Sequence, residues 1–449
     1  MKKFILLCTF CWGMLVPGAR ACTSFLAGRN ATIDGSTFIT YAADSHTLYG
    51  ALKFIPAARH PKNSTMEIRE WDTNKLLGHI PQVEYTYKVV GNMNEHQLSI
   101  TESTWGGRPE LVDTTGIIDY GSLMYIALQR AKTAREAITV MTDLVNEYGY
   151  YSSGESFSIA DPEEVWIMEM IGKGPQNQGA VWVAVRIPDD CIAAHANQSR
   201  IHKFPLDDKE NCLYSPDVIS FAREQGYFNG LNKDFSFADA YAPADFGALR
   251  GCEARVWSFY NRFNSSMGKY LSYLNGKSKE YLPLYIKPDK KLSVQDMKDA
   301  MRDHFEGTPF DMTQDVGAGP FKCPYRFRPM TFKVDSVEYT NERAVATQQT
   351  AFTLVAQMRS WLPNAIGGVL WFGVDDTNTC VYVPLYACLN EVPECYSELN
   401  GSMYDLSWTS AFWIHNWVAN MAYSRYDQMI EDIRPVQKDI ETTFNVQQP

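Results

Sequence analysis

The sequence predicts an α+β protein in which stacked β-sheets are flanked by helices. Two blocks of strand-like segments, one near the N-terminus and one in the middle of the chain, are separated by segments with helical periodicity. A further pair of strand-like segments precedes a helical C-terminus. Because the chain has no internal repeat, no low-complexity tract and no linker rich in Pro, Gly or Ser, we expect one large domain.

The N-terminal block begins with a predicted β-hairpin. Residues 22–26 are apolar and partly β-branched, residues 33–36 read Ile-Asp-Gly-Ser and favour a turn, and residues 37–42 form the second strand. Residues 83–90 alternate between apolar and polar side chains, which predicts a half-buried strand. Residues 97–103 are predicted to form another strand of the same block.

Two amphipathic helices follow this block. They are predicted over residues 120–132 and 133–148 from the spacing of their apolar side chains. Thr133 has the side chain of an N-cap, Glu136 follows it at the spacing of a capping box, and Gly149 is a typical helix stop.

The remaining predicted elements are again strands followed by helices. The middle strands cover residues 157–160, 165–171, 181–187 and 191–196, and the helices after them cover residues 216–225, 252–263 and 293–305. The last elements are strands at residues 366–374 and 381–386 and one long helix at residues 406–433.

The first 21 residues have the pattern of a secretory signal peptide. Two lysines precede an apolar run of thirteen residues, 4–16, and Ala19-Arg20-Ala21 supplies the small residues of a cleavage site. The run is shorter than the roughly 20 residues that span a bilayer. We therefore expect residues 1–21 to be removed, residues 22–449 to form a single large domain, and the protein to be periplasmic or extracellular.

Charge and composition restrict the partners of the mature chain. Removal of Lys2, Lys3 and Arg20 with the signal peptide would change the formal net charge from −11 to −14. Such an acidic protein is repelled by nucleic acid and by anionic lipid. We therefore expect a small-molecule or peptide substrate, no nucleic-acid partner and no transmembrane segment in the mature chain. The sequence leaves open whether copies of the chain form a homo-oligomer.

Eight cysteines remain after the predicted cleavage, and Cys22 becomes the N-terminal residue. Cys388 and Cys395 are close enough in sequence for a local disulfide loop. If Cys22 is a free nucleophile, however, an odd number of thiols is left, so at least one other is unpaired. The sequence therefore assigns no disulfide.

The position of Cys22 predicts its chemistry. A cysteine thiol has a pKa of about 8.5 and an α-amino group a pKa of about 7.7–8.0. After cleavage one residue carries both groups, and the neutral amine can take the thiol proton, as in an N-terminal nucleophile. Before cleavage the same nitrogen is an amide, so removal of the signal peptide would also activate the protein. The predicted mature chain has no HExxH helix, G-x-S-x-G elbow, P-loop or CxxC pair, and we expect no metal and no cofactor.

Two other interpretations of Cys22 stay open on these residues. An exported protein that begins with cysteine can be a lipoprotein acylated on that thiol, and this would make it a non-catalytic, lipid-anchored protein of the envelope. Ala19 and Arg20 stand where bacterial lipidation signals usually have Leu and a small residue, and Arg20 fits poorly. Alternatively, Cys22 is a structural cysteine.

The residues after Cys22 resemble the cysteine dipeptidases (dipeptidase A type) of the N-terminal-nucleophile hydrolase superfamily. The resemblance extends over essentially the whole mature chain. It rests on the order and spacing of segments at residues 22–28, 34–37, 43–47, 91–95, 161–166, 182–190, 196–198, 304–311 and 367–373. It implies a four-layer αββα sandwich and hydrolysis of short peptides, mainly dipeptides, without metal. Penicillin V acylases and bile-salt hydrolases are related, so an amidase for N-acyl amino acids is the alternative function.

The resemblance also implies the site residues. Cys22 is the nucleophile, and Asp44 corresponds to the aspartate that orients its α-amine. Asn197 corresponds to the asparagine that donates to the oxyanion, and Arg255 is the best match for the arginine of the site. Read alone, Asp44 could be a turn former, and Asn197 could belong to a glycosylation sequon.

Three further residues are expected to contact substrate. Many relatives have an arginine three residues before the aspartate, whereas this chain has Tyr41, so the cation that would favour a thiolate is missing there. Glu102 and Thr104 fall near the segment that lends a backbone N–H to the oxyanion hole. His195, two residues before Asn197, is interpreted as structural rather than as a base.

Overall fold

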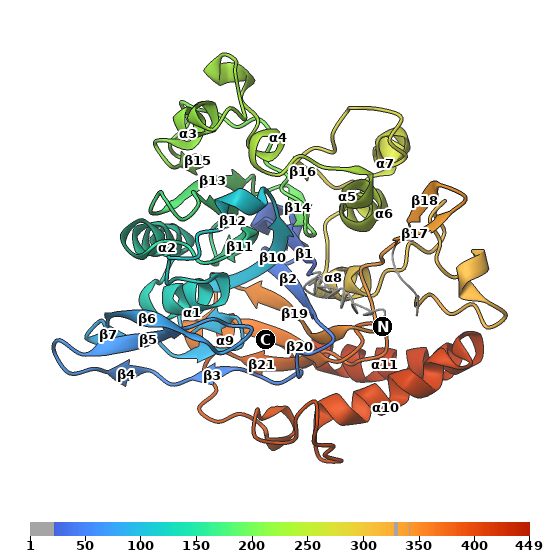
Figure 1. Cartoon of the computed structure of the whole chain (residues 1–449). Helices are drawn as coiled ribbons and strands as arrows, with labels where there is room; N and C mark the ends of the chain where they lie inside the picture. Colours follow the sequence, from blue (N-terminus) through green and yellow to red (C-terminus); the bar gives the residue numbers. More distant parts are fainter. Residues whose placement is uncertain (1–21, 327–330, 341) are drawn as a thin grey trace, which may run out of the picture.

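The protein is described by a computed structural model, which covers residues 22–326, 331–340 and 342–449 (Figure 1). Two large antiparallel sheets form its centre. The seven-stranded sheet has the order β16 (Tyr285–Ile286), β14 (Ile192–His195), β1 (Ser24–Ala27), β2 (Thr37–Asp44), β19 (Thr350–Met358), β20 (Val369–Val374) and β21 (Val383–Tyr386). The eight-stranded sheet has the order β15 (Cys212–Tyr214), β13 (Ala180–Ile187), β12 (Val165–Gly172), β11 (Gly154–Ala160), β10 (Ser99–Gly106), β9 (Met93–Asn94), β8 (Val89–Val90) and β3 (Phe54–Ile55).

The two sheets pack face to face over one apolar core. Leu26 and Ile39 of the seven-stranded sheet belong to the same buried cluster as Ile167 and Val183 of the eight-stranded sheet. Full burial of one such side chain contributes about 1.5–3 kcal/mol to folding. Burial of these side chains between the sheets therefore stabilises the packing of one sheet on the other.

Helices cover the outer face of each sheet (Figure 1). Against the eight-stranded sheet lie α1 (Tyr120–Arg130) and α2 (Ala134–Tyr148), which share a core cluster with β11 and β12. Against the seven-stranded sheet lie α6 (Ala254–Phe263) and α8 (Val294–Met301). The stacked rings of Phe25 and Phe259, with centroids 4.1 Å apart, join β1 to α6. This mixed architecture confirms the predicted α+β class.

Smaller elements surround this body. The strands are β4 (Ala58–Arg59), β5 (Thr65–Arg69), β6 (Leu76–Pro81), β7 (Tyr85–Thr86), β17 (Thr331–Val334) and β18 (Val337–Thr340). The helices are α3 (Val218–Glu224), α4 (Phe237–Tyr241), α5 (Phe246–Ala248), α7 (Leu271–Leu274), α9 (Asn364–Gly367), α10 (Ala411–Tyr423) and α11 (Tyr426–Val446).

The alternation of side chains along β2 places the predicted site residues Tyr41 and Asp44 on opposite faces of the strand. Ile39 and Tyr41 point into the core between the sheets, whereas Phe38 and Ala42 belong to the cluster under α6 and α8. By the same alternation Asp44 lies on the helix side and Tyr41 on the sheet side. Cys22 shares the inter-sheet core with Leu26.

Several local predictions are confirmed. β1 and β2 pair as an antiparallel hairpin with Leu26 opposite Ile39. The side chain of Thr133 accepts a hydrogen bond from the backbone N–H of Glu136, and Gly149 ends α2 with a φ of 74°. The residues that predict the hairpin and the ends of α2 are close in sequence, so both can be predicted without knowledge of distant contacts.

Other predictions are wrong in extent. The C-terminal helix is two helices, α10 and α11, because the backbone leaves the helical conformation at Arg425 (φ −149°, ψ 52°). The strand predicted at residues 83–90 is two short strands, β7 and β8. The sequence also missed β19, which lies between β2 and β20.

The described residues contain no helix long and apolar enough to cross a bilayer. Their eight cysteines are all free, including Cys388 and Cys395. The predicted signal peptide, residues 1–21, lies outside the described residues.

Candidate active site

Cys22 lies two residues before β1, with 6% of its surface exposed. The backbone of its neighbour Thr23 bridges to Ala42 on β2 through hydrogen bonds of 3.0 and 3.4 Å, which fixes the cysteine against that strand. Its Sγ atom lies 3.4 Å from Glu102 Oε1 and 3.8 Å from the Tyr41 hydroxyl. Burial raises the pKa of the thiol well above its usual value, and the nearby carboxylates add to this shift. The thiol therefore needs a base before it can attack a carbonyl.

Asp44 is buried at the end of β2 beside a cation that the sequence did not reveal. Its carboxylate pairs with the Arg343 guanidinium and accepts a hydrogen bond of 2.6 Å from the hydroxyl of Thr350. Burial raises the pKa of Asp44, and the charge of Arg343 opposes that shift. Arg343 is 299 residues away in the chain, so no local motif could have indicated this pair.

Arg255 contacts both Cys22, the predicted nucleophile, and Asn197, the predicted oxyanion donor. It lies in the first turn of α6, directly after a π-helical turn at Leu249–Glu253, and is 1% exposed. Its Nη1 donates to the carbonyl oxygen of Cys22 at 2.8 Å, and its Nη2 donates to Asn197 Oδ1 at 2.9 Å. Burial, the main cause, lowers the pKa of Arg255 to about 9, and the charge of Arg343 adds to the shift.

Asn197 follows β14 and is held on both sides. Its φ of 58° is in the left-handed region, where asparagine is tolerated better than most residues. Its amide Nδ2 donates to the carbonyl oxygen of Thr104 at 2.6 Å while Oδ1 accepts from Arg255. Thr104 thus contributes a backbone acceptor. This geometry points the Asn197 amide toward the end of β10, the strand that also carries Glu102.

Glu102 belongs to a buried acidic pair that the sequence identified only in part. Its Oε1 accepts a hydrogen bond from the Tyr41 hydroxyl, so Tyr41 positions Glu102 beside Cys22. On the neighbouring strand Glu155 lies opposite Thr104 and is fully buried. Burial raises the pKa of Glu155 well above its usual value, and the negative charge of Glu102 adds to that effect. Glu155 carried no sequence signal, because its proximity depends on the register of β10 and β11.

His195 has a structural position, in line with the interpretation from the sequence. Its two ring nitrogens are hydrogen-bonded to the hydroxyls of Ser103 (2.6 Å) and Ser158 (2.7 Å). Burial, with a smaller effect from nearby arginines, lowers the pKa of His195 to about 3, so the ring is neutral. The same Ser103 hydroxyl accepts a hydrogen bond from the backbone N–H of Asn197 at 3.3 Å. The histidine therefore supports the Asn197 loop rather than the thiol.

A cavity of about 290 Å³, here called the aromatic cavity, lies next to this cluster. It is lined by Leu48, Tyr49, Ala51, Lys53, Trp71, Gly91, Asn92, Tyr125, Phe352, Phe372, Glu398, Gly401 and Ser402. The ring of Tyr41 packs edge-on against Phe352 with centroids 5.6 Å apart, so Tyr41 contacts both Cys22 and a residue that lines the cavity. Lys53 and Glu398 form an ion pair of 3.3 Å among its lining residues.

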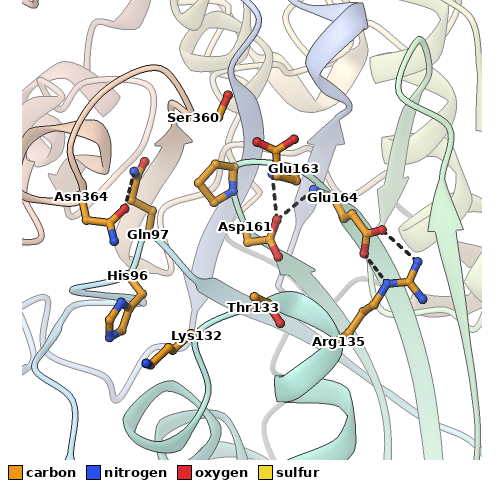
Figure 2. Close-up of a pocket in the computed structure, with 11 residues that line it drawn as sticks. His96, Gln97, Lys132, Thr133, Arg135, Asp161, Glu163, Glu164, Ser360 and Asn364 are labelled. Atoms are coloured by element: carbon orange, nitrogen blue, oxygen red, sulfur yellow. Dashed lines mark hydrogen bonds and ion pairs between the residues drawn. The ribbon is translucent and has the colours of Figure 1, made fainter.

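A second pocket, of about 500 Å³, is separate from these residues (Figure 2). Its lining includes Asp161, which accepts hydrogen bonds from the backbone N–H groups of Ala134 at the start of α2 and of Glu164 before β12. The lining also includes the ion pair between Arg135 and Glu164. None of the site residues predicted from the sequence lines it. Among the described residues, no group of His, Cys, Asp and Glu side chains is arranged to hold a metal ion.

Comparison with known proteins identifies the family. Residues 52–439 match the model of peptidase family C69. A protein described as a probable dipeptidase from Latilactobacillus sakei is 27% identical over 425 residues, which cover 90% of this chain and 82% of that protein. A probable dipeptidase from Salmonella dublin is 27% identical over 408 residues, covering 86% and 85%. Dipeptidase A from Lactobacillus helveticus is 23% identical over 426 residues, covering 90% and 82%.

The family match begins after Cys22, Tyr41 and Asp44, and these three residues therefore lie outside it. It includes Glu102, Asn197 and the helix that carries Arg255. Because the match extends over most of the chain, it settles the protein's class. The chain belongs to peptidase family C69 and is a hydrolase of peptide bonds, as the resemblance in its sequence predicts.

Proposed function

We propose that the protein is an exported cysteine dipeptidase whose nucleophile, Cys22, becomes the N-terminal residue when residues 1–21 are removed. The names of its relatives support dipeptides as substrates. The observation that carries the proposal is the position of Arg255, which contacts both the Cys22 backbone and the Asn197 side chain. An N-terminal thiol and a candidate oxyanion donor are thereby held in one buried cluster.

We assign the fold to the four-layer αββα sandwich of the N-terminal-nucleophile hydrolases. The order of layers supports this assignment, since two sheets share a core and each has helices on its outer face. In this arrangement the nucleophile lies directly before β1, a strand inside the seven-stranded sheet.

The proposed reaction uses the amine of Cys22 as the base. The amine takes the thiol proton, and the thiolate attacks the carbonyl carbon of the substrate's first residue. The C–N bond then breaks, and the α-ammonium returns the proton to the leaving amine. Water hydrolyses the resulting thioester and regenerates the thiol. Asp44, paired with Arg343, supplies the negative charge that favours the ammonium form.

Asn197 stabilises the charge that develops on the substrate oxygen. Its amide is already oriented by Arg255 and by the Thr104 carbonyl. One such donor contributes about 2.7–4 kcal/mol to the barrier, or a factor of roughly 10²–10³ in rate. The aromatic cavity beyond Tyr41 offers space for a substrate side chain.

The test combines the mature N-terminus with activity. Mass spectrometry of the exported protein is expected to show a free N-terminal Cys22, and a dipeptide panel is expected to be hydrolysed. Cys22→Ala should abolish turnover, whereas Cys388→Ala, which removes an exposed thiol, should not change it. A diacylglyceryl group on Cys22 would refute the proposal, as would full activity of a protein that keeps Ala21 ahead of Cys22. Preference for glycine or taurine conjugates over dipeptides would favour an acylase-like amidase instead.

A further inference from the structure

Glu102 and Glu155 lie side by side on the eight-stranded sheet. β10 and β11 are antiparallel, with Thr104 opposite Glu155 and Glu102 opposite Phe157. Side chains two residues apart on a strand share a face, so Glu102 is the diagonal neighbour of Glu155. Their exposed fractions are 1% and 0%, and both carboxyl groups are removed from solvent.

Most of the oxygens of this pair are unpartnered. Among the described residues, no group has hydrogen-bond geometry to Glu102 Oε2 or to either carboxyl oxygen of Glu155. The side chains of Glu102 and Thr104 are the neighbours close enough to Glu155 to change its pKa through side-chain contacts. An unpaired buried carboxylate is costly, and two of them cannot both stay ionised without a nearby cation. Burial and the charge of Glu102 accordingly raise the pKa of Glu155.

This arrangement is suited to a cation that arrives with the substrate. No arginine or lysine of the described chain donates to the three free oxygens, and the acidic pair has no third ligand of a metal site there. Glu102 Oε1 accepts hydrogen bonds from the Tyr41 hydroxyl and the Cys22 thiol. The remaining oxygens are acceptors for N–H groups.

The distance from the thiol indicates which cation fits. Bond lengths and angles place the α-nitrogen of a peptide about 2.5 Å from the carbonyl carbon of the same residue. In a reactive complex the attacking sulfur lies about 3–3.5 Å from that carbon. The α-ammonium must then lie within roughly 3–6 Å of Sγ, and Glu102 Oε1 is 3.4 Å from Sγ. A lysine side-chain ammonium is several bonds further from the carbonyl carbon and does not meet this geometry.

We propose that Glu102 and Glu155 form the subsite for the free α-ammonium group of the substrate and so restrict the enzyme to peptides with an unblocked N-terminus. The inference rests on the proposed function and deepens it. Anchoring of the ammonium next to Cys22 places the first peptide bond at the thiol, so one residue is released from the amino end.

The first test uses the wild-type enzyme and three matched substrates. These are Ala-Ala, its N-acetyl derivative and propionyl-Ala, in which hydrogen replaces the amino group. We expect kcat/KM for the N-acetyl derivative and for propionyl-Ala to be about 10- to 100-fold lower than for Ala-Ala. This is the range for loss of a hydrogen bond to a charged group. Equal turnover of Ala-Ala and propionyl-Ala would overturn the inference while leaving a Cys22-dependent dipeptidase intact. No turnover of any dipeptide would instead overturn the proposed function.

The second test asks whether Glu102 serves the substrate or the α-ammonium of Cys22 itself. Glu102→Gln is expected to lower kcat/KM for Ala-Ala about 10- to 100-fold and to leave kcat/KM for propionyl-Ala nearly unchanged. The ratio of the two kcat/KM values, which measures the discrimination between the substrates, should therefore fall towards one. Glu102→Asp should restore part of the discrimination, and Glu155→Gln should reduce it less than Glu102→Gln. An equal loss for both substrates would show that Glu102 acts on the enzyme's own amine and would refute the assignment. Glu84→Gln, on an exposed side chain, is the matched control, with the mature N-terminus verified for every variant.

Discussion

The substitution Arg255→Lys tests the contact that connects Cys22 with Asn197. The Arg255 guanidinium donates to five acceptors, namely Gly251 O, Cys22 O, Thr23 Oγ1, Ala196 O and Asn197 Oδ1. A lysine has one nitrogen with three N–H groups, so at least two acceptors lose their donor. A buried polar group left without a partner costs about 1–3 kcal/mol, which gives a loss of about 2–6 kcal/mol in the free energy of unfolding.

The kinetic effect should exceed what a loss of stability explains. Without Arg255 the Asn197 amide is no longer oriented, and loss of one oxyanion donor lowers kcat by roughly 10²–10³-fold. Urea denaturation measures the free energy of unfolding. Steady-state kinetics on a dipeptide measure kcat, without denaturant and at a temperature where the variant is folded. Arg262→Lys, on the same helix but 38% exposed at its side chain, is the control and should change kcat little.

A double-mutant cycle with Asn197→Ala sharpens this prediction. If Arg255 acts on the reaction through Asn197, the double variant should be no slower than the slower single variant, because both changes remove the same interaction. Fully additive losses would refute the positioning role. So would a folded Arg255→Lys variant whose kcat is within threefold of wild type.

Three further predictions concern the surroundings of the site. Arg343→Gln leaves the Asp44 carboxylate buried without its cation and should lower the free energy of unfolding by about 3–5 kcal/mol in urea denaturation; a change below 1 kcal/mol would contradict the buried pair. The pKa of His195 is about 3 in the folded state and about 6.5 in the unfolded state, so between these pH values only the unfolded state binds the proton. The contribution of His195 to the free energy of unfolding should therefore fall as the pH drops from about 6.5 towards 3. The slope is about 1.4 kcal/mol per pH unit, and it should be absent from His195→Gln. Tyr41→Phe removes the hydrogen bond to Glu102 and should lower kcat/KM for dipeptides about 3- to 10-fold, whereas an unchanged value would show that Glu102 needs no support.

The controls for these variants use exposed side chains. Arg59 forms an ion pair with Glu84 in which the two side chains are 80% and 83% exposed. Arg59→Gln should therefore change the free energy of unfolding by less than about 0.5 kcal/mol. The pH series should include His46→Gln, which lies on an exposed turn. Its curve should follow that of the wild type throughout.

Local signals in the sequence were sufficient for part of the fold. The hairpin of β1 and β2 and the cap at Thr133 depend on residues near in sequence, and both are present. β19 was missed because it lies inside the seven-stranded sheet with both faces covered, so its apolar residues do not alternate. The break between α10 and α11 has no Gly or Pro, and it coincides with a hydrogen bond from the backbone of Asp427 to the carbonyl oxygen of Phe321, a contact from a distant loop.

The site shows the same division. The resemblance to a family named Cys22, Asn197 and Arg255, and the structure brings these three into direct contact through one guanidinium. Glu155 and Arg343 could not be named, because the first depends on strand register and the second on a contact across 299 residues. Since Tyr41 stands where many relatives have an arginine, the sequence suggested that a cation favouring the thiolate was missing at position 41. Arg343 supplies a cation beside Asp44 instead, on the other side of β2 from Tyr41.

The burial of the cysteines has a consequence for redox chemistry. Thiols react with peroxide and with disulfides as thiolates, so a raised pKa slows oxidation. Burial raises the pKa of Cys191, Cys212 and Cys380, and these thiols should stay reduced in air while the exposed Cys388 is modified. Burial also raises the pKa of the Cys22 thiol, so the nucleophile proposed above would be protonated between turnovers. The nucleophile would therefore resist oxidative damage between turnovers in an oxidising compartment.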